Sequence, residues 1–175
     1  MNLQLKNIKV NLTFSEETIM FQADIFANNK KVGYASNDGR GGCTFYNAYP
    51  NEREALKQAE AYAQTLPSTF FEYNGEKHEI KSSLEHWIDD QISEYVNAKE
   101  RAKFEKKVQK MCDTKIVWGV PNSGSVRTIG FNGLKINLQS WYGTTHGRIS
   151  IEKLVAKVKG ELKAGEVIFN KNIPI

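Results

Sequence analysis

The sequence predicts an α+β fold, and three observations lead to this class. Apolar and polar residues alternate, as in strands, near both ends of the chain, within residues 1–49 and 114–170. Apolar residues recur at helical spacing in the middle, 51–112, and again after Ser150. Strands grouped in this way favour antiparallel sheets over alternating βαβ units. With 175 residues, we expect a single domain over 1–175.

The first 49 residues are typical of an antiparallel β-meander. A break in the alternation at Lys6-Asn7 predicts a β-bulge. The pair Asn28-Asn29 suits a tight hairpin, because asparagine tolerates a positive φ. The four predicted strands are residues 3–14, Ile19–Phe26, Lys31–Ser36 and Cys43–Tyr46, with a glycine-rich connection between the last two.

Two helices are expected in the middle of the chain. Asn51 with Glu54 forms a capping pattern for the first, which ends at Pro67. Residues 68–81 contain Asn74-Gly75 and form either a short hairpin or a packed loop. The second helix covers about 83–111.

The long helix changes its apolar face partway along. Leu84, Ile88 and Ile92 share one sector, whereas Phe104 and Val108 lie roughly opposite to it. Either the helix kinks near residues 97–102, or its two halves bury opposite faces. Both alternatives leave a row of lysines on one side of the second half.

The C-terminal third returns to strands and ends with a helix. A hairpin is expected from Arg127–Phe131 and Leu134–Leu138 around Asn132-Gly133. Residues 139–149 are expected to form a loop, and Ser150 to cap the last helix. The remaining predicted strands are Lys115–Val120 and Val167–Phe169.

Charge is distributed unevenly along the chain, whose net charge is +4. Residues 51–97 carry four Lys/Arg and ten Asp/Glu, net −6, whereas 98–175 carry fifteen and six, net +9. Residues 1–50 are close to neutral at +1. The basic part is suited to attract a polyanion or an acidic protein surface. The alternative is a solvated surface with no partner.

Basic and aromatic residues in this part form the main candidate binding site. Lysines that contact phosphates, together with aromatic rings that stack on bases, hold single-stranded nucleic acid. The alternative for Trp141 and Tyr142 is a place in the core. The candidate residues are Lys99, Arg101, Lys103, Lys106, Lys107, Lys110, Arg127, Trp141, Tyr142 and Arg148, with His146 nearby.

A second candidate is the loop Gly39-Arg40-Gly41-Gly42, whose backbone amides would approach a phosphate. A strand-like segment follows these glycines, whereas phosphate-binding fingerprints need a helix there, so a connecting loop is the favoured interpretation. Cys43 with His78, His86 or His146 is the corresponding catalytic hypothesis.

Several classes of protein are not expected. There is no apolar run that would span a bilayer or act as a secretory signal, and two distant cysteines, Cys43 and Cys112, fit free thiols in a reducing compartment. We therefore expect a cytoplasmic protein. No metal-ligand spacing is present, and neither a metal nor a cofactor is predicted.

Residues 21–44, FQADIFANNKKVGYASNDGRGGCT, resemble small uncharacterised proteins of bacterial phages and mobile elements, and the resemblance covers about 19–66. It implies a genomic setting, in which small proteins without enzyme motifs are often inhibitors of host defences, including CRISPR effectors. It supplies no catalytic residues.

The leading functional hypothesis is therefore a non-enzymatic binding protein, of the anti-CRISPR type, that acts on a host ribonucleoprotein or its RNA through the basic surface. One alternative is a small nucleotide- or nucleic-acid-directed enzyme that uses the Gly39–Gly42 loop. Another is a structural module that oligomerises through the long helix. The oligomeric state is left open.

Overall fold

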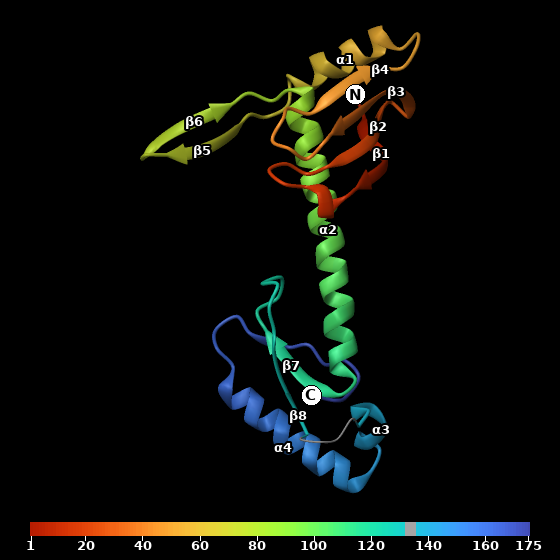
Figure 1. Ribbon diagram of the computed structural model, residues 1–175. Coiled ribbons are helices and arrows are strands. Elements are labelled where there is room, and N and C mark those ends of the chain that lie inside the picture. The colour runs from red at the N-terminus through yellow and green to blue at the C-terminus, as the bar shows by residue number, and fades with distance from the viewer. Residues whose placement is uncertain (132–135) are drawn as a thin grey trace. The chain divides into compact units, whose positions relative to one another are not determined.

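The computed structural model describes residues 1–131 and 136–175 and confirms the α+β class (Figure 1). Its sheets are antiparallel, and the long helix α2 covers Leu84–Cys112. The range predicted as one domain divides into two compact units, residues 1–97 and 98–175. Each unit has hydrophobic clusters of its own, and the boundary between the units lies within α2.

The first unit is built on the predicted four-stranded meander, with the order β1-β2-β3-β4. The expected bulge is present, because the register of β1 shifts after Lys6 and Asn7 has a φ of +53°. Asn28 and Asn29, at φ +49° and +66°, form the predicted two-residue turn. The strands are β1 (Leu3–Val10), β2 (Phe21–Ala27), β3 (Lys30–Asn37) and β4 (Phe45–Ala48).

One face of this sheet is covered by helices. The core contains Ile25 from the sheet, Ala59 from α1 (Arg53–Ala63) and Ile88 from α2, each with 0% exposure. Because side chains alternate along a strand, every second residue points to the other face. That other face carries exposed side chains such as Lys6 and Phe45.

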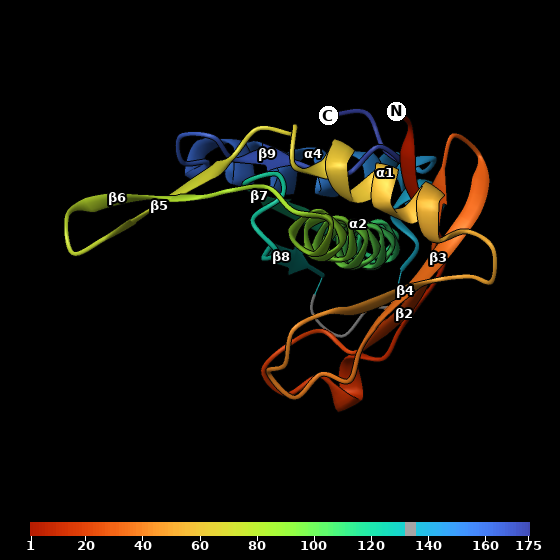
Figure 2. The same ribbon diagram turned by 90° about the horizontal axis from the view of Figure 1, so that it is seen from above.

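For residues 68–81 the sequence left two alternatives, a hairpin and a packed loop. The structure has the hairpin, formed by β5 (Thr69–Tyr73) and β6 (Glu76–Ile80). Asn74 and Gly75 form its turn, with φ values of +52° and +80°. Figures 1 and 2 both show the hairpin extending away from the four-stranded sheet.

Helix α2 runs without a break through 97–102. Its first half buries Leu84, Ile88 and Ile92 in the core of the first unit. Its second half buries Val108 and Cys112, with Phe104 and Met111 packed beside them, in a cluster of the second unit. The second of the two alternatives from the sequence is thus confirmed: one helix buries different faces in its two halves.

The second unit is organised around the strand β7 (Lys115–Gly119), which lies between β8 (Arg127–Gly130) and β9 (Val167–Ile168). Ile116 and Trp118 pack in the cluster that contains helix α4 (Thr145–Glu161), and Val117 packs in the cluster that contains the end of α2. Burial on both faces explains the continuous apolar run of this strand.

Buried Asn170 joins the end of α2 to β7. Its side-chain amide donates to the carbonyls of Cys112 and Lys115 at 3.2 and 2.8 Å, and its Oδ1 accepts from the Val117 backbone N–H at 2.8 Å. The bond to Cys112 satisfies a carbonyl group that the end of a helix leaves without a partner within the helix. Nothing in the sequence pattern indicated this role.

The segment after β8 differs from the predicted hairpin. Asn132, Gly133 and Leu134 lie outside the described residues, but Leu138, expected in a strand, begins the short helix α3 (Leu138–Tyr142). Asn137 caps this helix by accepting from the Ser140 backbone N–H at 3.0 Å. The cap and the full burial of Leu138 outweigh the alternating pattern.

The last helix starts earlier than predicted. Thr144, not Ser150, caps α4 and accepts from the Gly147 backbone N–H at 3.0 Å. A Cβ at Gly147 would lie 2.0 Å from the carbonyl oxygen of Trp141, so glycine permits this close turn.

Two further boundaries are corrected. The strand predicted to Phe14 ends at Val10, because Asn11 accepts from the Thr13 backbone N–H and begins a short 3₁₀ helix, Leu12–Phe14. Asn51 does not cap α1. It lies in the preceding turn with a φ of +68°, and the helix ends at Ala63, before Pro67.

Replacing Ile88 with alanine should lower the free energy of unfolding by about 2–5 kcal/mol, since a fully buried isoleucine leaves a cavity. Ile80→Ala is the matched control, because Ile80 is 39% exposed, and it should change stability by about 0.5 kcal/mol or less. Urea unfolding followed by circular dichroism measures both. Equal losses in the two variants would contradict the assigned core.

Candidate nucleic-acid interface

The second half of α2 carries five exposed lysines in one sector of the helix, here called the lysine stripe. Advancing about 100° per residue places all five side chains on the same side. Lys103 approaches Glu100 at 4.0 Å, one turn away on the helix. The stripe consists of Lys99, Lys103, Lys106, Lys107 and Lys110.

The lysine stripe is exposed because the other side of the helix supplies the apolar contacts. Phe104, Val108 and Cys112 occupy that side and pack in the second unit. Arg101, predicted with the lysines, falls by helical spacing on the side of Val108, yet it remains exposed.

The charge division coincides with the structural division. Residues 98–175, the second unit, carry net +9, and residues 1–97, with nine Lys/Arg and fourteen Asp/Glu, carry net −5. The uneven charge of the sequence is therefore a property of two folded units. The lysine stripe belongs to the basic one.

Arg127, on β8, contacts other side chains of the second unit. Its guanidinium pairs with the Glu166 carboxylate and lies over the Trp118 ring, 5.1 Å from the centroid. The pKa of Glu166 is lowered, first by the Lys163 backbone N–H that donates to it at 2.8 Å and then by Arg127. Arg127 therefore stabilises the β8–β9 end of this unit.

Trp141 and Tyr142 are half-buried and pack against the core of the second unit, as the core alternative predicts. The Trp141 ring meets Phe131 edge-on at 4.6 Å. The Tyr142 hydroxyl donates to Glu152 at 3.1 Å, a bond that raises the pKa of the tyrosine. Arg148 lies 5.5 Å from the Tyr142 centroid, so the structure does bring this predicted pair together.

The glycine loop satisfies its own backbone. Asn37 accepts from the Gly39 N–H at 2.8 Å, and Thr18 accepts from the Gly41 N–H at 3.2 Å. The Glu17 carboxylate also lies beside Gly41, where a Cβ would be 2.2 Å from its Oε2. With amides in use and a carboxylate nearby, the arrangement of Gly39, Arg40, Gly41 and Gly42 favours the connecting-loop interpretation over a phosphate site.

Cys43, the cysteine of the catalytic hypothesis, precedes Thr44, whose backbone N–H donates to Glu85, the residue before His86, at 3.0 Å. Cys43 is exposed and Cys112 is buried, and both are free thiols. His78 stacks on Phe71 at 5.2 Å, and His86 lies 3.1 Å from the Thr69 hydroxyl. Within 1–131 and 136–175, no group of three His, Cys, Asp or Glu could hold a metal ion.

Sequence reasoning missed a second aromatic and basic surface, on the helix-free side of the four-stranded sheet. Tyr34 lies at its centre, with ring centroids 6.1 Å from Phe45 and 5.7 Å from Tyr49. Lys31 lies over the Tyr49 ring at 4.4 Å, and Lys6 lies over the Phe26 ring at 4.5 Å. We call this surface the sheet face, and it consists of Lys6, Lys9, Phe26, Lys31, Tyr34, Phe45 and Tyr49.

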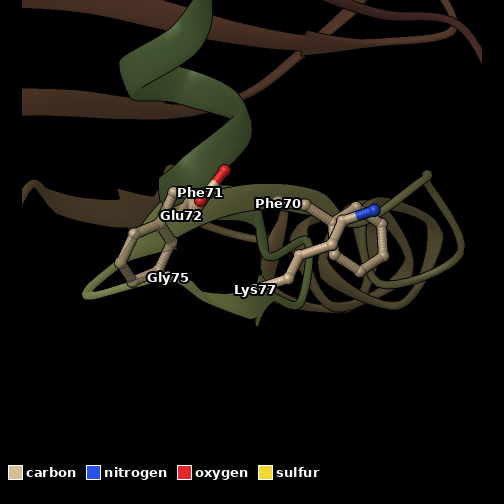
Figure 3. A pocket seen from close by; sticks show the side chains of 5 residues that line it. All are labelled: Phe70, Phe71, Glu72, Gly75 and Lys77. Atoms are coloured by element: carbon tan, nitrogen blue, oxygen red, sulfur yellow. The ribbon is translucent and has the colours of Figure 1, made fainter.

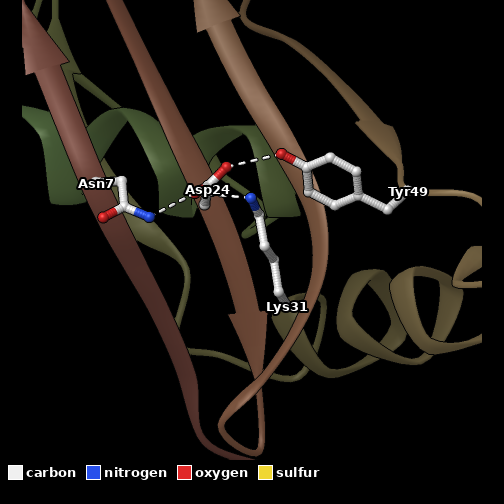
Figure 4. Close-up of polar contacts among 4 residues, drawn as sticks. All are labelled: Asn7, Asp24, Lys31 and Tyr49. Carbon is white, nitrogen blue, oxygen red and sulfur yellow. Dashed lines mark hydrogen bonds and ion pairs between the residues drawn. The ribbon is translucent and has the colours of Figure 1, made fainter.

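Asp24 anchors the sheet face (Figure 4). It accepts from Asn7 at 2.6 Å and from the Tyr49 hydroxyl at 2.8 Å, and it pairs with Lys31 at 3.0 Å. Burial raises the pKa of Asp24, but the bonds from Asn7, Tyr49 and Lys31 together outweigh it and lower the pKa below its usual value. Asp24 thereby links three strands, β1, β2 and β3, and the β4–α1 connection.

The β5–β6 hairpin carries exposed aromatic residues as well. Phe70 is 56% exposed and lies under the Lys77 ammonium, 4.4 Å from its ring centroid, while Phe71 points away from that pair (Figure 3). Phe70, Phe71 and Lys77 contribute to an open pocket of about 490 Å³.

The alternation of inward and outward positions along the predicted strands contained the signal for the sheet face. Residues 26, 34 and 45 fall on the outward positions of predicted strands, where an aromatic residue gains little burial. Placing these three rings side by side required the register of three strands, which could not be predicted from the sequence.

A scan against protein-family models, a search of curated proteins and a search of solved structures each found no match. Among the described residues, no helix is long and apolar enough to cross a membrane.

Asp24→Asn should remove stability in a pH-dependent way. Because the folded pKa of Asp24 is lowered, its ionised form stabilises the fold above the unfolded pKa, and that contribution is lost as the pH falls through the folded pKa. The difference in unfolding free energy between wild type and variant should be constant near pH 6 and shrink below about pH 4. Urea unfolding at stepped pH values measures it. A difference that is the same at every pH would contradict the role of the charge.

The two thiols should react very differently with iodoacetamide at pH 8. Burial, with a smaller contribution from Asp113, raises the pKa of Cys112 to about 11, whereas Cys43 is exposed. Mass spectrometry should find one modified cysteine, Cys43, in the native protein and two after denaturation. Rapid native modification of Cys112 would contradict its burial.

Proposed function

We propose that this chain is a non-enzymatic binding protein that contacts the phosphates of RNA through the lysine stripe of α2. The observation that carries the proposal is the stripe itself: five exposed lysines in one sector of a continuous helix, in a unit of net charge +9. A row of lysines gives affinity for phosphate without base specificity.

The length of the stripe suits a run of phosphates. From Lys99 to Lys110 the helix rises roughly 16 Å, at 1.5 Å per residue. Several consecutive phosphates of a strand that followed this row would lie within reach of its lysines.

The resemblance of residues 19–66 to phage proteins directs this proposal toward a host defence ribonucleoprotein, such as a CRISPR effector, with its RNA as the ligand. The net charge of +4 argues against imitation of DNA by the whole chain. An acidic protein surface would also attract the stripe.

The alternatives have less support. An enzyme based on the Gly39–Gly42 loop would need free amides, and those of Gly39 and Gly41 already donate within the loop region. An oligomer formed through an apolar face of α2 would need such a face exposed, whereas Phe104 and Val108 pack in the second unit.

The combined variant Lys103→Glu, Lys107→Glu and Lys110→Glu should bind single-stranded RNA much more weakly. Each lost phosphate contact lowers the slope of log K against log salt by about 0.7, so three should lower it by roughly 2. Fluorescence anisotropy with a labelled 10-nucleotide RNA, over a series of salt concentrations, measures the slope.

The control carries the same change of net charge elsewhere in the second unit, at Lys153, Lys157 and Lys159, which are exposed on α4. It should retain most of the wild-type slope. Equal effects of the two triple variants would show that net charge alone, and not the stripe, determines binding. Absence of RNA binding by wild type, even at low salt, would overturn the proposal and favour an acidic protein partner.

A further inference from the structure

We infer that the sheet face of the first unit is a stacking surface for the unpaired bases of a single-stranded nucleic acid. The inference deepens the proposed function and rests on it for the ligand, RNA, but it uses different residues in a different unit. It concerns contact with bases, whereas the proposal for the lysine stripe concerns contact with phosphates.

Two aromatic side chains of the sheet face, Phe45 and Tyr34, are exposed on the side of the sheet that faces away from the core. Phe45 is 56% exposed and Tyr34 is 36% exposed, although both lie on strands whose other side faces a filled core. Rings on an outward position gain little from burial in the monomer. Flat, exposed rings in a row are suited to stack on bases, since every base has a π-face.

Cations accompany the rings. Lys6 and Lys31 lie over the Phe26 and Tyr49 rings, and Lys9 is exposed on the same side of β1. The carboxylate of this network, Asp24, is already paired with Lys31 and accepts from Asn7 and Tyr49. Phosphates beside stacked bases would therefore meet lysines rather than an unpaired acid.

The acidic character of the first unit is located elsewhere. Of its fourteen Asp/Glu residues, ten fall within 51–97, the range of α1, the β5–β6 hairpin and the first half of α2. The two helices cover the opposite side of the sheet. The sheet face thus avoids most of the charge that would repel a nucleic acid.

Contacts within the unit also hold two of the rings in place. The Tyr49 hydroxyl is held by Asp24, and Tyr34 packs between the Phe45 and Tyr49 rings (Figure 4 shows the Tyr49–Asp24–Lys31 part). Rings that are fixed before binding lose little conformational entropy when a base stacks on them. A protein partner would also fit exposed aromatic rings, but the lysines beside them favour a flexible, anionic strand.

The test compares two RNAs with the same phosphates. A labelled 10-nucleotide single strand and its abasic counterpart, which lacks all bases, are titrated with full-length wild type and variants by fluorescence anisotropy. Wild type should bind the base-bearing strand at least tenfold more tightly, as expected when one or more bases stack on aromatic rings. Phe45→Leu should remove most of this preference, and Phe45→Tyr should retain it, because tyrosine restores a flat ring.

Phe70→Leu is the matched control, because Phe70 is also 56% exposed on an antiparallel strand of the same unit. Like the rings of the sheet face, the Phe70 ring has a lysine, Lys77, beside it. It should keep the wild-type preference. Circular dichroism and thermal unfolding confirm that each variant is folded. Tyr34→Leu is a second probe and should act like Phe45→Leu.

The outcomes separate this inference from the proposed function. Equal affinity of wild type for the two strands, or an equal loss for both strands in Phe45→Leu, overturns the stacking surface and leaves the lysine stripe standing. A base preference that depends on Phe45 but survives reversal of Lys103, Lys107 and Lys110 supports the stacking surface, even if the stripe fails. No binding of either strand overturns both.

Discussion

Helix α2 has to bury an apolar face in each of two cores while remaining a single helix. Because the helix advances about 100° per residue, the positions of Ile92 and Val108 fix which side faces each core. The lysines that follow the first apolar sector are then left on the solvent side. Exposure of the lysine stripe is thus a consequence of how the helix satisfies its cores, and no other element is needed to present it.

Polar contacts join neighbouring elements at defined positions, which apolar packing alone does not specify. Asn170 joins the last turn of α2 to β7 through three hydrogen bonds in a buried place. Asp24 does the same for the strands of the first unit, with a charge that is partly shielded from water. An unsatisfied polar group at either place would cost the fold more than one hydrogen bond contributes, so these residues specify the arrangement.

The two candidate surfaces offer complementary chemistry. The lysine stripe is a row of charges without rings, suited to phosphates, and the sheet face is a row of rings with a few charges, suited to bases. Arg127, Trp141 and Tyr142, which were predicted as part of the basic and aromatic site, make contacts within the second unit. The exposed lysines of α2 and the exposed rings of the sheet face therefore belong to different units.

Local sequence patterns were enough to predict the α+β class, the meander with its bulge at Lys6-Asn7, the turn at Asn28-Asn29, the long helix and the row of lysines on it. These depend on local spacing and on residues whose backbone preferences act over a few positions. Helix starts such as Thr144 and Asn137 were missed, because a capping side chain competes with apolar alternation and only packing decides between them. The hydrogen bonds of Asn170 and the grouping of aromatic rings on the sheet face could be found only from the tertiary structure. Each joins residues from segments far apart in the chain, and only strand register and core packing bring those segments together.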